Sequence, residues 1–188
     1  MRRTRRGGTG RELKAKPAAA LQPARSWHWV LGTWFGSGLS PFASGTAGTA
    51  ATLPLVAALG LGLPGYAWLN PGCLIAALLL FYPGVVAATA IERATGKHDS
   101  GKIVIDETVG TLLTFAFLSP AAFHSPRVYA AGFFLFRLID VWKPWIIDDA
   151  QALPRGWGVM MDDVLGGLLA GALMLGAVHG LPASWLGL

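Results

Sequence analysis

Charged residues are confined to two stretches of this chain, and that confinement limits the folds open to it. No Asp, Glu, Lys or Arg lies between Ser26 and Ile91 or between Val164 and Leu188. Charged residues make up 13% of the 188 residues, whereas they make up about 25% of a typical soluble domain. The single cysteine, Cys73, excludes a disulfide framework within the chain and a Cys-based zinc site. The sequence therefore predicts a single small unit that belongs in a membrane.

Five apolar stretches predict the helices of a compact all-α bundle. They cover residues 48–69, 72–91, 108–125, 128–142 and 164–186. Each is near the length that a helix needs to cross a bilayer, roughly 20 residues. Because Pro54, Pro64 and Pro120 interrupt them, we expect some helices to be kinked or only partly inserted. The chain is therefore interpreted as a multi-pass membrane protein with about four to five apolar helices.

The first 25 residues form a separate basic segment. They contain eight basic residues and a single acid, Glu12, so we expect a disordered tail that is either simply solvated or attracted to anionic headgroups. Nucleic-acid binding would need a basic face with interleaved aromatic residues, which the rest of the chain lacks. We therefore divide the chain into a tail, 1–25, and a helical membrane domain, 26–188. With the tail in the cytoplasm, five spans would place the loops 92–107 and 143–163 on that same side.

A segment rich in glycine and hydroxyl residues precedes the first apolar stretch. In that position, backbone N–H groups and hydroxyls can bind a phosphate, helped by the helix dipole. A glycine-rich turn with a helix cap is the structural alternative, and the segment is not a Walker loop because no Lys follows its glycines. Its candidate phosphate-binding residues are Gly36, Ser37, Gly38, Ser40, Gly45, Thr46, Gly48 and Thr49.

Carboxylates stand at two predicted helix entrances and on a third helix. Asp106 and Glu107 precede the third apolar stretch, Asp162 and Asp163 precede the fifth, and Asp140 lies near the end of the fourth. Ionised groups beside lipid are costly unless they are paired or used, and oxygen-rich clusters suit Mg²⁺. Because neighbouring helix residues point about 100° apart, we expect only one of Asp106 and Glu107 to face a given site. An acidic loop and helix caps explain each cluster alone, but together they indicate metal-dependent phosphoryl transfer.

Basic residues and a histidine accompany these acids. The window that ends at Glu107 also contains His98, Asp99 and Lys102. Arg137, Asp140 and Lys143 recur at i, i+3 and i+6, which roughly aligns them on one helix face. They could clamp a phosphate and a metal together, or Arg137 could form an internal salt bridge with Asp140 while Lys143 snorkels.

Four motifs, taken in order, resemble those of the phosphatidylglycerophosphatase A family, Mg²⁺-dependent membrane lipid phosphatases of bacteria. The matching strings are FGSGLSP with SGTAGT, HDSGKIVIDE, FRLIDVWKPW and GVMMDD, which span about residues 33 to 163. The resemblance favours an all-α fold. It implies hydrolysis of phosphatidylglycerophosphate to phosphatidylglycerol and phosphate in phospholipid biosynthesis, at the cytoplasmic face of the inner membrane. The chain departs from the family pattern at Ser44, where Pro is usual, and in its basic tail.

On this interpretation, each candidate residue receives a role. The Mg²⁺ ligands are expected to be Asp106, Glu107, Asp140, Asp162 and Asp163, with Asp99 as a further candidate. Lys102, Arg137 and Lys143 would hold phosphate oxygens, and the segment 36–49 would close over the phosphate group. A metal-activated water is the expected nucleophile, with His98 or a carboxylate transferring protons. A phosphoaspartyl intermediate is the alternative.

Two other classes of protein compete with this interpretation. A small membrane transporter could use Asp106, Glu107, Arg137 and Asp140 as a cation or proton pathway, although its carboxylates would be expected near mid-bilayer rather than at helix entrances. A purely structural membrane subunit is the third class. The phospholipid substrate and the bilayer are the expected partners, and the sequence leaves the oligomeric state open.

Overall fold

The computed structural model describes residues 26–66, 69–144 and 146–188. The regular structure within these ranges is helical, which confirms the prediction of an all-α fold. The basic tail, 1–25, lies outside the described residues.

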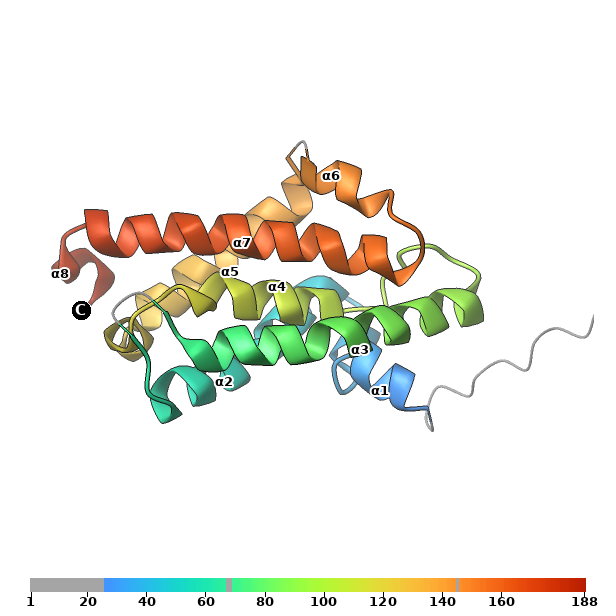
Figure 1. Cartoon of the computed structure of the whole chain (residues 1–188), viewed down its shortest axis with the longest axis horizontal. Coiled ribbons are helices and arrows are strands. Elements are labelled where there is room, and N and C mark those ends of the chain that lie inside the picture. The colour runs from blue at the N-terminus through green and yellow to red at the C-terminus, as the bar shows by residue number, and fades with distance from the viewer. Residues whose placement is uncertain (1–25, 67–68, 145) are drawn as a thin grey trace, which may run out of the picture.

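Five longer helices build the molecule (Figure 1). They are α2 (Ser44–Gly62), α3 (Pro71–Thr95), α4 (Ile105–Ala116), α5 (Pro126–Trp142) and α7 (Gly156–Gly180). The shorter elements are α1 (Trp27–Gly32), α6 (Ile146–Gln151), α8 (Ala183–Leu186) and the 3₁₀ turns η1 (Ser37–Leu39) and η2 (Pro120–His124). Successive long helices run in alternating directions, so the starts of α2, α4 and α7 meet the ends of α3 and α5 at one end of the bundle.

Helix α4 is the central element, and it lies between α3 and α7 (Figure 1). Every residue of α4 except Glu107 is buried. Its 12 residues make it about 18 Å long, well short of the roughly 30 Å of a hydrocarbon core. The predicted stretch 108–125 is therefore divided: α4 ends at Ala116, and a separate 3₁₀ turn begins at Pro120, whose ring cannot continue a helix.

Small residues allow α4 and α7 to pack closely. A Cβ atom at Gly167 would overlap the backbone of Gly110, so a larger residue there would force the two helices apart. This contact fixes the rotation of α4 against α7, and with it the direction in which their acids point. Asp106 and Glu107 lie in the first turn of α4. Asp162 and Asp163 were predicted to precede the last helix, but they lie about two turns inside it because α7 already begins at Gly156.

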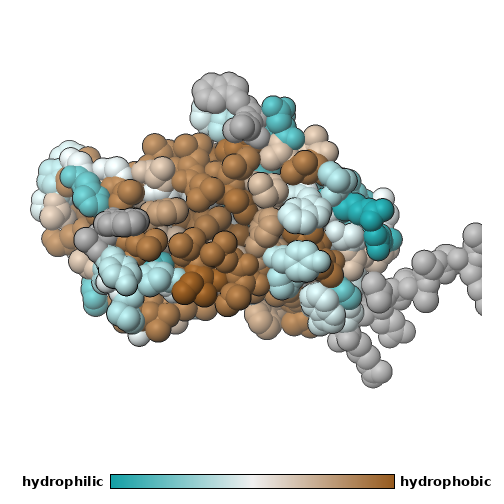
Figure 2. Space-filling view, viewed as in Figure 1, coloured by the Kyte–Doolittle hydropathy of each residue, from teal (hydrophilic) through white to brown (hydrophobic). Residues whose placement is uncertain are grey.

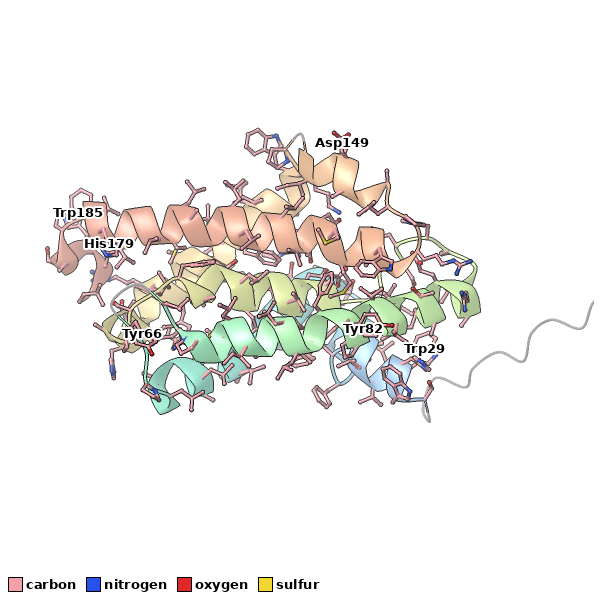
Figure 3. The ribbon with its side chains drawn as sticks, in the orientation of Figure 1. Trp29, Tyr66, Tyr82, Asp149, His179 and Trp185 are labelled. Carbon is pink, nitrogen blue, oxygen red and sulfur yellow. The ribbon has the colours of Figure 1, made fainter. Side chains whose placement is uncertain are left out.

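Within the described residues, three helices, α2, α3 and α7, are long and apolar enough to cross a membrane. Figure 2 shows apolar residues across the middle of the visible face, with hydrophilic residues toward both ends. Tyr66 and Trp185 lie at one end and Trp29 at the other (Figure 3), as expected for aromatic residues at two membrane interfaces. These features indicate a membrane protein in which α4 is a buried central helix.

Candidate active site

An acidic pocket of about 290 Å³ opens at the end of the bundle where α4 and α7 begin and α5 ends. All five predicted metal ligands line it, namely Asp106, Glu107, Asp140, Asp162 and Asp163. Asp99, Lys143 and Ser44 also contribute to its wall. Residues that are far apart in the sequence therefore form one polar pocket in an otherwise apolar bundle.

Three of these carboxylates form the centre of the pocket. Oxygen atoms of Asp106, Glu107 and Asp163 lie within 4.8 Å of one another. Oε2 of Glu107 is buried and has no hydrogen-bond partner among the described residues. Because a buried oxygen without a partner is destabilising, this cluster is chemically suited to hold a cation.

The expectation that only one of Asp106 and Glu107 faces the site was wrong. Both line the pocket, and Oδ1 of Asp106 accepts a hydrogen bond from the backbone N–H of Glu107. Farther along a helix, side chains that point about 100° apart would face different neighbours. Asp106 and Glu107 lie in the first turn of α4, at the end of the helix, and there both side chains reach the pocket.

Burial has a direct electrostatic consequence for the first turn of α4. It raises the pKa of Asp106 well above its usual range, and the neighbouring Glu107 and Asp162 raise it further. Burial also raises the pKa of Glu107, although Arg137 opposes the shift. Without a cation in the pocket, these carboxyls therefore hold protons at pH values where an ordinary carboxyl is ionised.

Two cations compensate the outer carboxylates. Nη1 of Arg137 lies 2.6 Å from Oδ2 of Asp140 and 3.7 Å from Oε1 of Glu107. Nζ of Lys143 donates a hydrogen bond to Oδ2 of Asp162 at 2.6 Å. Although burial lowers the pKa of Lys143, this hydrogen bond and the charge of Asp162 raise it above its usual value, so the ammonium group stays charged.

The predicted row of Arg137, Asp140 and Lys143 on one helix face is only partly present. Arg137 and Asp140 pair at i and i+3, as in the internal salt bridge that the sequence allowed. Helix α5 ends at Trp142, and Lys143 takes a left-handed conformation with φ 44°. This change of direction turns Lys143 away from the α5 row and across to Asp162 on α7.

Gly45, in the first turn of α2, brings a helix N-terminus to the pocket. A Cβ at this position would overlap Oε1 of Glu107 and lie 2.9 Å from Nη1 of Arg137. Only glycine leaves room for both groups. The N–H groups of the first turn have no partner within a helix, so this end of α2 can bind an anion at the pocket.

The rest of the glycine-rich segment does not form the loop that the sequence predicted. Helix α2 begins at Ser44, so Thr46, Gly48 and Thr49 are helical, and Gly48 packs against Val104. The remaining candidates lie in the turn before α2 and do not line the acidic pocket: Gly36, Ser37, Gly38 and Ser40. The hydroxyls of Ser37 and Ser40 donate to nearby backbone carbonyls instead. Helix α2 begins before the predicted apolar stretch because Gly45 and Gly48 are small enough to let its first turns lie against Glu107 and Val104.

His98 and Lys102 lie outside the acidic pocket, against expectation. Nδ1 of the exposed His98 is 3.8 Å from Oε1 of Glu92, and Nζ of Lys102 lies 5.7 Å from the centre of the Trp29 ring. Asp99 does reach the pocket, and its Oδ2 accepts a hydrogen bond from Gln151. His98 and Lys102 are close to Asp99 in the sequence but do not share its position at the pocket, because the loop before α4 changes direction at Asp99, which has φ 47°. Ser44 lines the pocket but was not among the predicted site residues.

Comparison with known proteins shows that the part of the chain that forms the pocket matches a recognised protein family. Residues 30–178 match the family model described as phosphatidylglycerophosphatase A. Phosphatidylglycerophosphatase A of Escherichia coli (strain K12) is 32% identical over 163 residues, covering 86% of this chain and 89% of that protein. The Haemophilus influenzae protein of the same name is 34% identical over 146 residues, 75% of this chain and 82% of that protein. A putative phosphatidylinositol-3-phosphatase of Bacteroides thetaiotaomicron is 38% identical over 142 residues, 74% of this chain and 86% of that protein. No solved structure matches the chain.

Proposed function

Because the chain belongs to the phosphatidylglycerophosphatase A family and is therefore a phosphoric monoester hydrolase, we propose that it hydrolyses phosphatidylglycerophosphate to phosphatidylglycerol and phosphate in phospholipid biosynthesis. The observation that carries this proposal is the acidic pocket, in which carboxylates from α4, α5 and α7 converge with two paired cations. The whole pocket lies within the residues that match the family.

The donor set supports Mg²⁺ as the cofactor. Asp106, Glu107 and Asp163 would hold it, because they offer only oxygen ligands, which hard cations prefer. The buried, unpartnered Oε2 of Glu107 supports the same assignment. When bound, such an ion supplies positive charge that neutralises phosphoryl oxygens.

The protein's own groups position the phosphate. Catalysis on a phosphate monoester depends mainly on orientation and charge neutralisation. Nη1 of Arg137 lies 2.6 Å from Asp140, and Nζ of Lys143 donates to Asp162 at 2.6 Å. Both cations can donate charge-assisted hydrogen bonds to phosphate oxygens. The first turn of α2 at Gly45 adds backbone N–H donors. We assign proton transfer to a pocket carboxylate rather than to His98, which lies outside.

The distribution of basic residues supports a cytoplasmic orientation of the pocket at the bacterial inner membrane. In the described ranges, the loops and helix ends at the pocket end of the bundle carry Arg93, Lys97, Lys102, Lys143 and Arg155. Arg127 lies at the opposite end, where it donates to backbone carbonyls of α8. Excess Lys and Arg mark the cytoplasmic side of multi-pass proteins. The active site would therefore receive its lipid substrate from the inner leaflet.

The detergent-purified chain is expected to release phosphate from phosphatidylglycerophosphate in mixed micelles when Mg²⁺ is present. Chelation should abolish release and added Mg²⁺ should restore it. Phosphatidylinositol 3-phosphate is the informative comparison substrate, because one relative carries that name, and we expect slower release from it. Undiminished release in chelator would contradict the metal assignment. No release from a folded chain would contradict the proposed substrate.

Mg²⁺ affinity is expected to fall as the pH is lowered. The pKa values of Asp106 and Glu107 are raised, so protons compete with the metal at pH values where ordinary carboxyls are already ionised. Each proton released on binding changes the apparent dissociation constant about tenfold per pH unit below these pKa values. Calorimetric titrations at several pH values, in two buffers of different ionisation enthalpy, measure both affinity and proton release. An affinity independent of pH without proton release would contradict this prediction.

A further inference from the structure

The face of the bundle between α3 and α7 carries a basic pocket that catalysis does not use. It has a volume of about 290 Å³ and lies between the end of α3 and the residue before α7. Arg93, Lys97, His98 and Arg155 line it, together with the carboxylate of Glu92 and with Thr89 and Gly96. Within the described part of the chain, no ion pair involves Arg93, Lys97 or Arg155. Three basic side chains without ion pairs therefore outnumber the single carboxylate of the pocket, Glu92, and an anion is the matching ligand.

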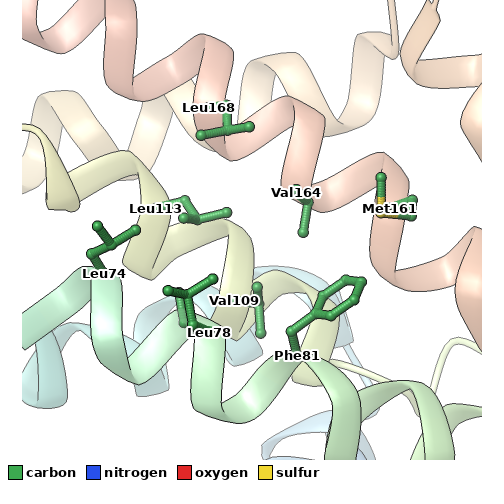
Figure 4. Close-up of a pocket in the computed structure, with 9 residues that line it drawn as sticks. Leu74, Leu78, Phe81, Val109, Leu113, Met161, Val164 and Leu168 are labelled. Carbon is green, nitrogen blue, oxygen red and sulfur yellow. The ribbon is translucent and has the colours of Figure 1, made fainter.

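An apolar groove of similar volume lies farther along the same two helices (Figure 4). Leu74, Leu78 and Phe81 of α3 form one wall, and Met161, Val164 and Leu168 of α7 form the other. Val109 and Leu113 of α4 form the floor. Because α3 and α7 are both candidate membrane spans, this groove opens toward the hydrocarbon of a bilayer.

The two pockets have the relative positions of a phosphate and an acyl chain. Phe81 borders the groove and Thr89 borders the basic pocket, and eight residues of helix separate them by about 12 Å. Trp157, at the start of α7, packs against Phe81 with ring centres 5.7 Å apart. A lipid phosphate at the basic pocket would thus leave its glycerol beside Trp157 and its chain at the groove.

We propose that the α3–α7 face binds one anionic bilayer phospholipid, with its phosphate at Arg93, Lys97 and Arg155 and one acyl chain in the apolar groove. Basic residues near the headgroups select anionic lipids, and arginine matches phosphate geometry well. A volume of about 290 Å³ is at the lower limit of ligand pockets, roughly 300–1,000 Å³, so the groove takes part of one chain rather than two. This lipid site is distinct from the acidic pocket, and binding there requires no hydrolysis.

A charge substitution with a matched control tests the basic half of the site. Native mass spectrometry of the full chain in detergent and chelator, titrated with phosphatidylglycerol, measures lipid binding without turnover. Arg93→Gln is expected to weaken binding about five- to tenfold. Lys102→Gln removes one positive charge from the same end of the bundle but outside the pocket, and should bind as the native chain does. Equal binding by the two variants overturns the proposal.

A second pair of variants tests the apolar half. Leu78→Trp fills the groove, whereas Leu79→Trp adds the same ring on α3 at an exposed position that does not line it. We expect weaker phosphatidylglycerol binding only in Leu78→Trp. If inorganic phosphate occupies the basic pocket while both tryptophan variants still bind lipid equally, the site is a free-phosphate site. If Leu78→Trp instead dissociates a dimer without changing lipid binding, the groove is a self-interface. Either result overturns the proposal.

The proposed lipid site and the proposed activity can fail independently. Asp163→Asn should keep phosphatidylglycerol binding in chelator, because Asp163 belongs to the acidic pocket and not to the α3–α7 face. Phosphatidylcholine, which carries no net charge, should bind more weakly than phosphatidylglycerol. Equal binding of both lipids overturns the charge-selective proposal, whatever the hydrolysis assay shows.

Discussion

Asp163→Asn is expected to reduce Mg²⁺-dependent phosphate release from phosphatidylglycerophosphate by more than about 100-fold, since even the outer partners of metal ligands contribute roughly 10–100-fold. Asp163 is buried on α7 with an oxygen within 4.8 Å of oxygens of Asp106 and Glu107. Asparagine keeps the size of the side chain but removes its charge. The fold is therefore expected to persist while the cation site weakens.

Asp149→Asn is the matched control for this substitution. Asp149 is exposed on α6 and does not line the acidic pocket (Figure 3), so the same chemical change should leave phosphate release unaltered. Initial rates across a Mg²⁺ titration, with thermal unfolding in detergent, separate loss of the site from loss of the fold. Hydrolysis with full Mg²⁺ dependence in Asp163→Asn would remove Asp163 from the site.

Gly45→Ala is expected to lower activity by up to about 100-fold, because small displacements of positioning groups can have effects of that size. The added methyl group would displace Oε1 of Glu107 and crowd Arg137. Both are the ends of flexible side chains, so the fold can adapt while the pocket is rearranged. Alanine also favours helix over glycine by up to about 1 kcal/mol. The unfolding temperature should therefore stay close to that of the native chain.

Gly62→Ala provides the control on the same helix. No atom lies within 4 Å of a Cβ at Gly62, so this variant should keep both activity and stability. Paired measurements of kcat, KM and unfolding temperature distinguish a rearranged pocket from a destabilised helix. Full activity in Gly45→Ala would show that α2 does not need to approach Glu107 and Arg137 this closely.

Local sequence pattern predicted an all-α bundle and the end of the bundle at which the acids lie, but not the start of α2 or the division of the stretch 108–125. Long apolar stretches indicated α3 and α7, because a helix satisfies its own backbone hydrogen-bonding groups inside a membrane. Asp106 lies in the first turn of α4, Asp163 about two turns into α7 and Asp140 near the end of α5, so alternating helix directions bring them to one end. The resemblance carried by the motifs supplied the chemistry, and the family match confirmed that recognition.

Only the tertiary structure decided which groups meet within that end. Lys143 pairs with Asp162 on another helix, Gly45 approaches Glu107, and His98 and Lys102 lie outside the pocket. Local pattern specifies which residues share a face of one helix. It does not specify how far one helix is rotated against the next, because that rotation depends on contacts such as Gly110 with Gly167, which are distant in the sequence and close only after packing.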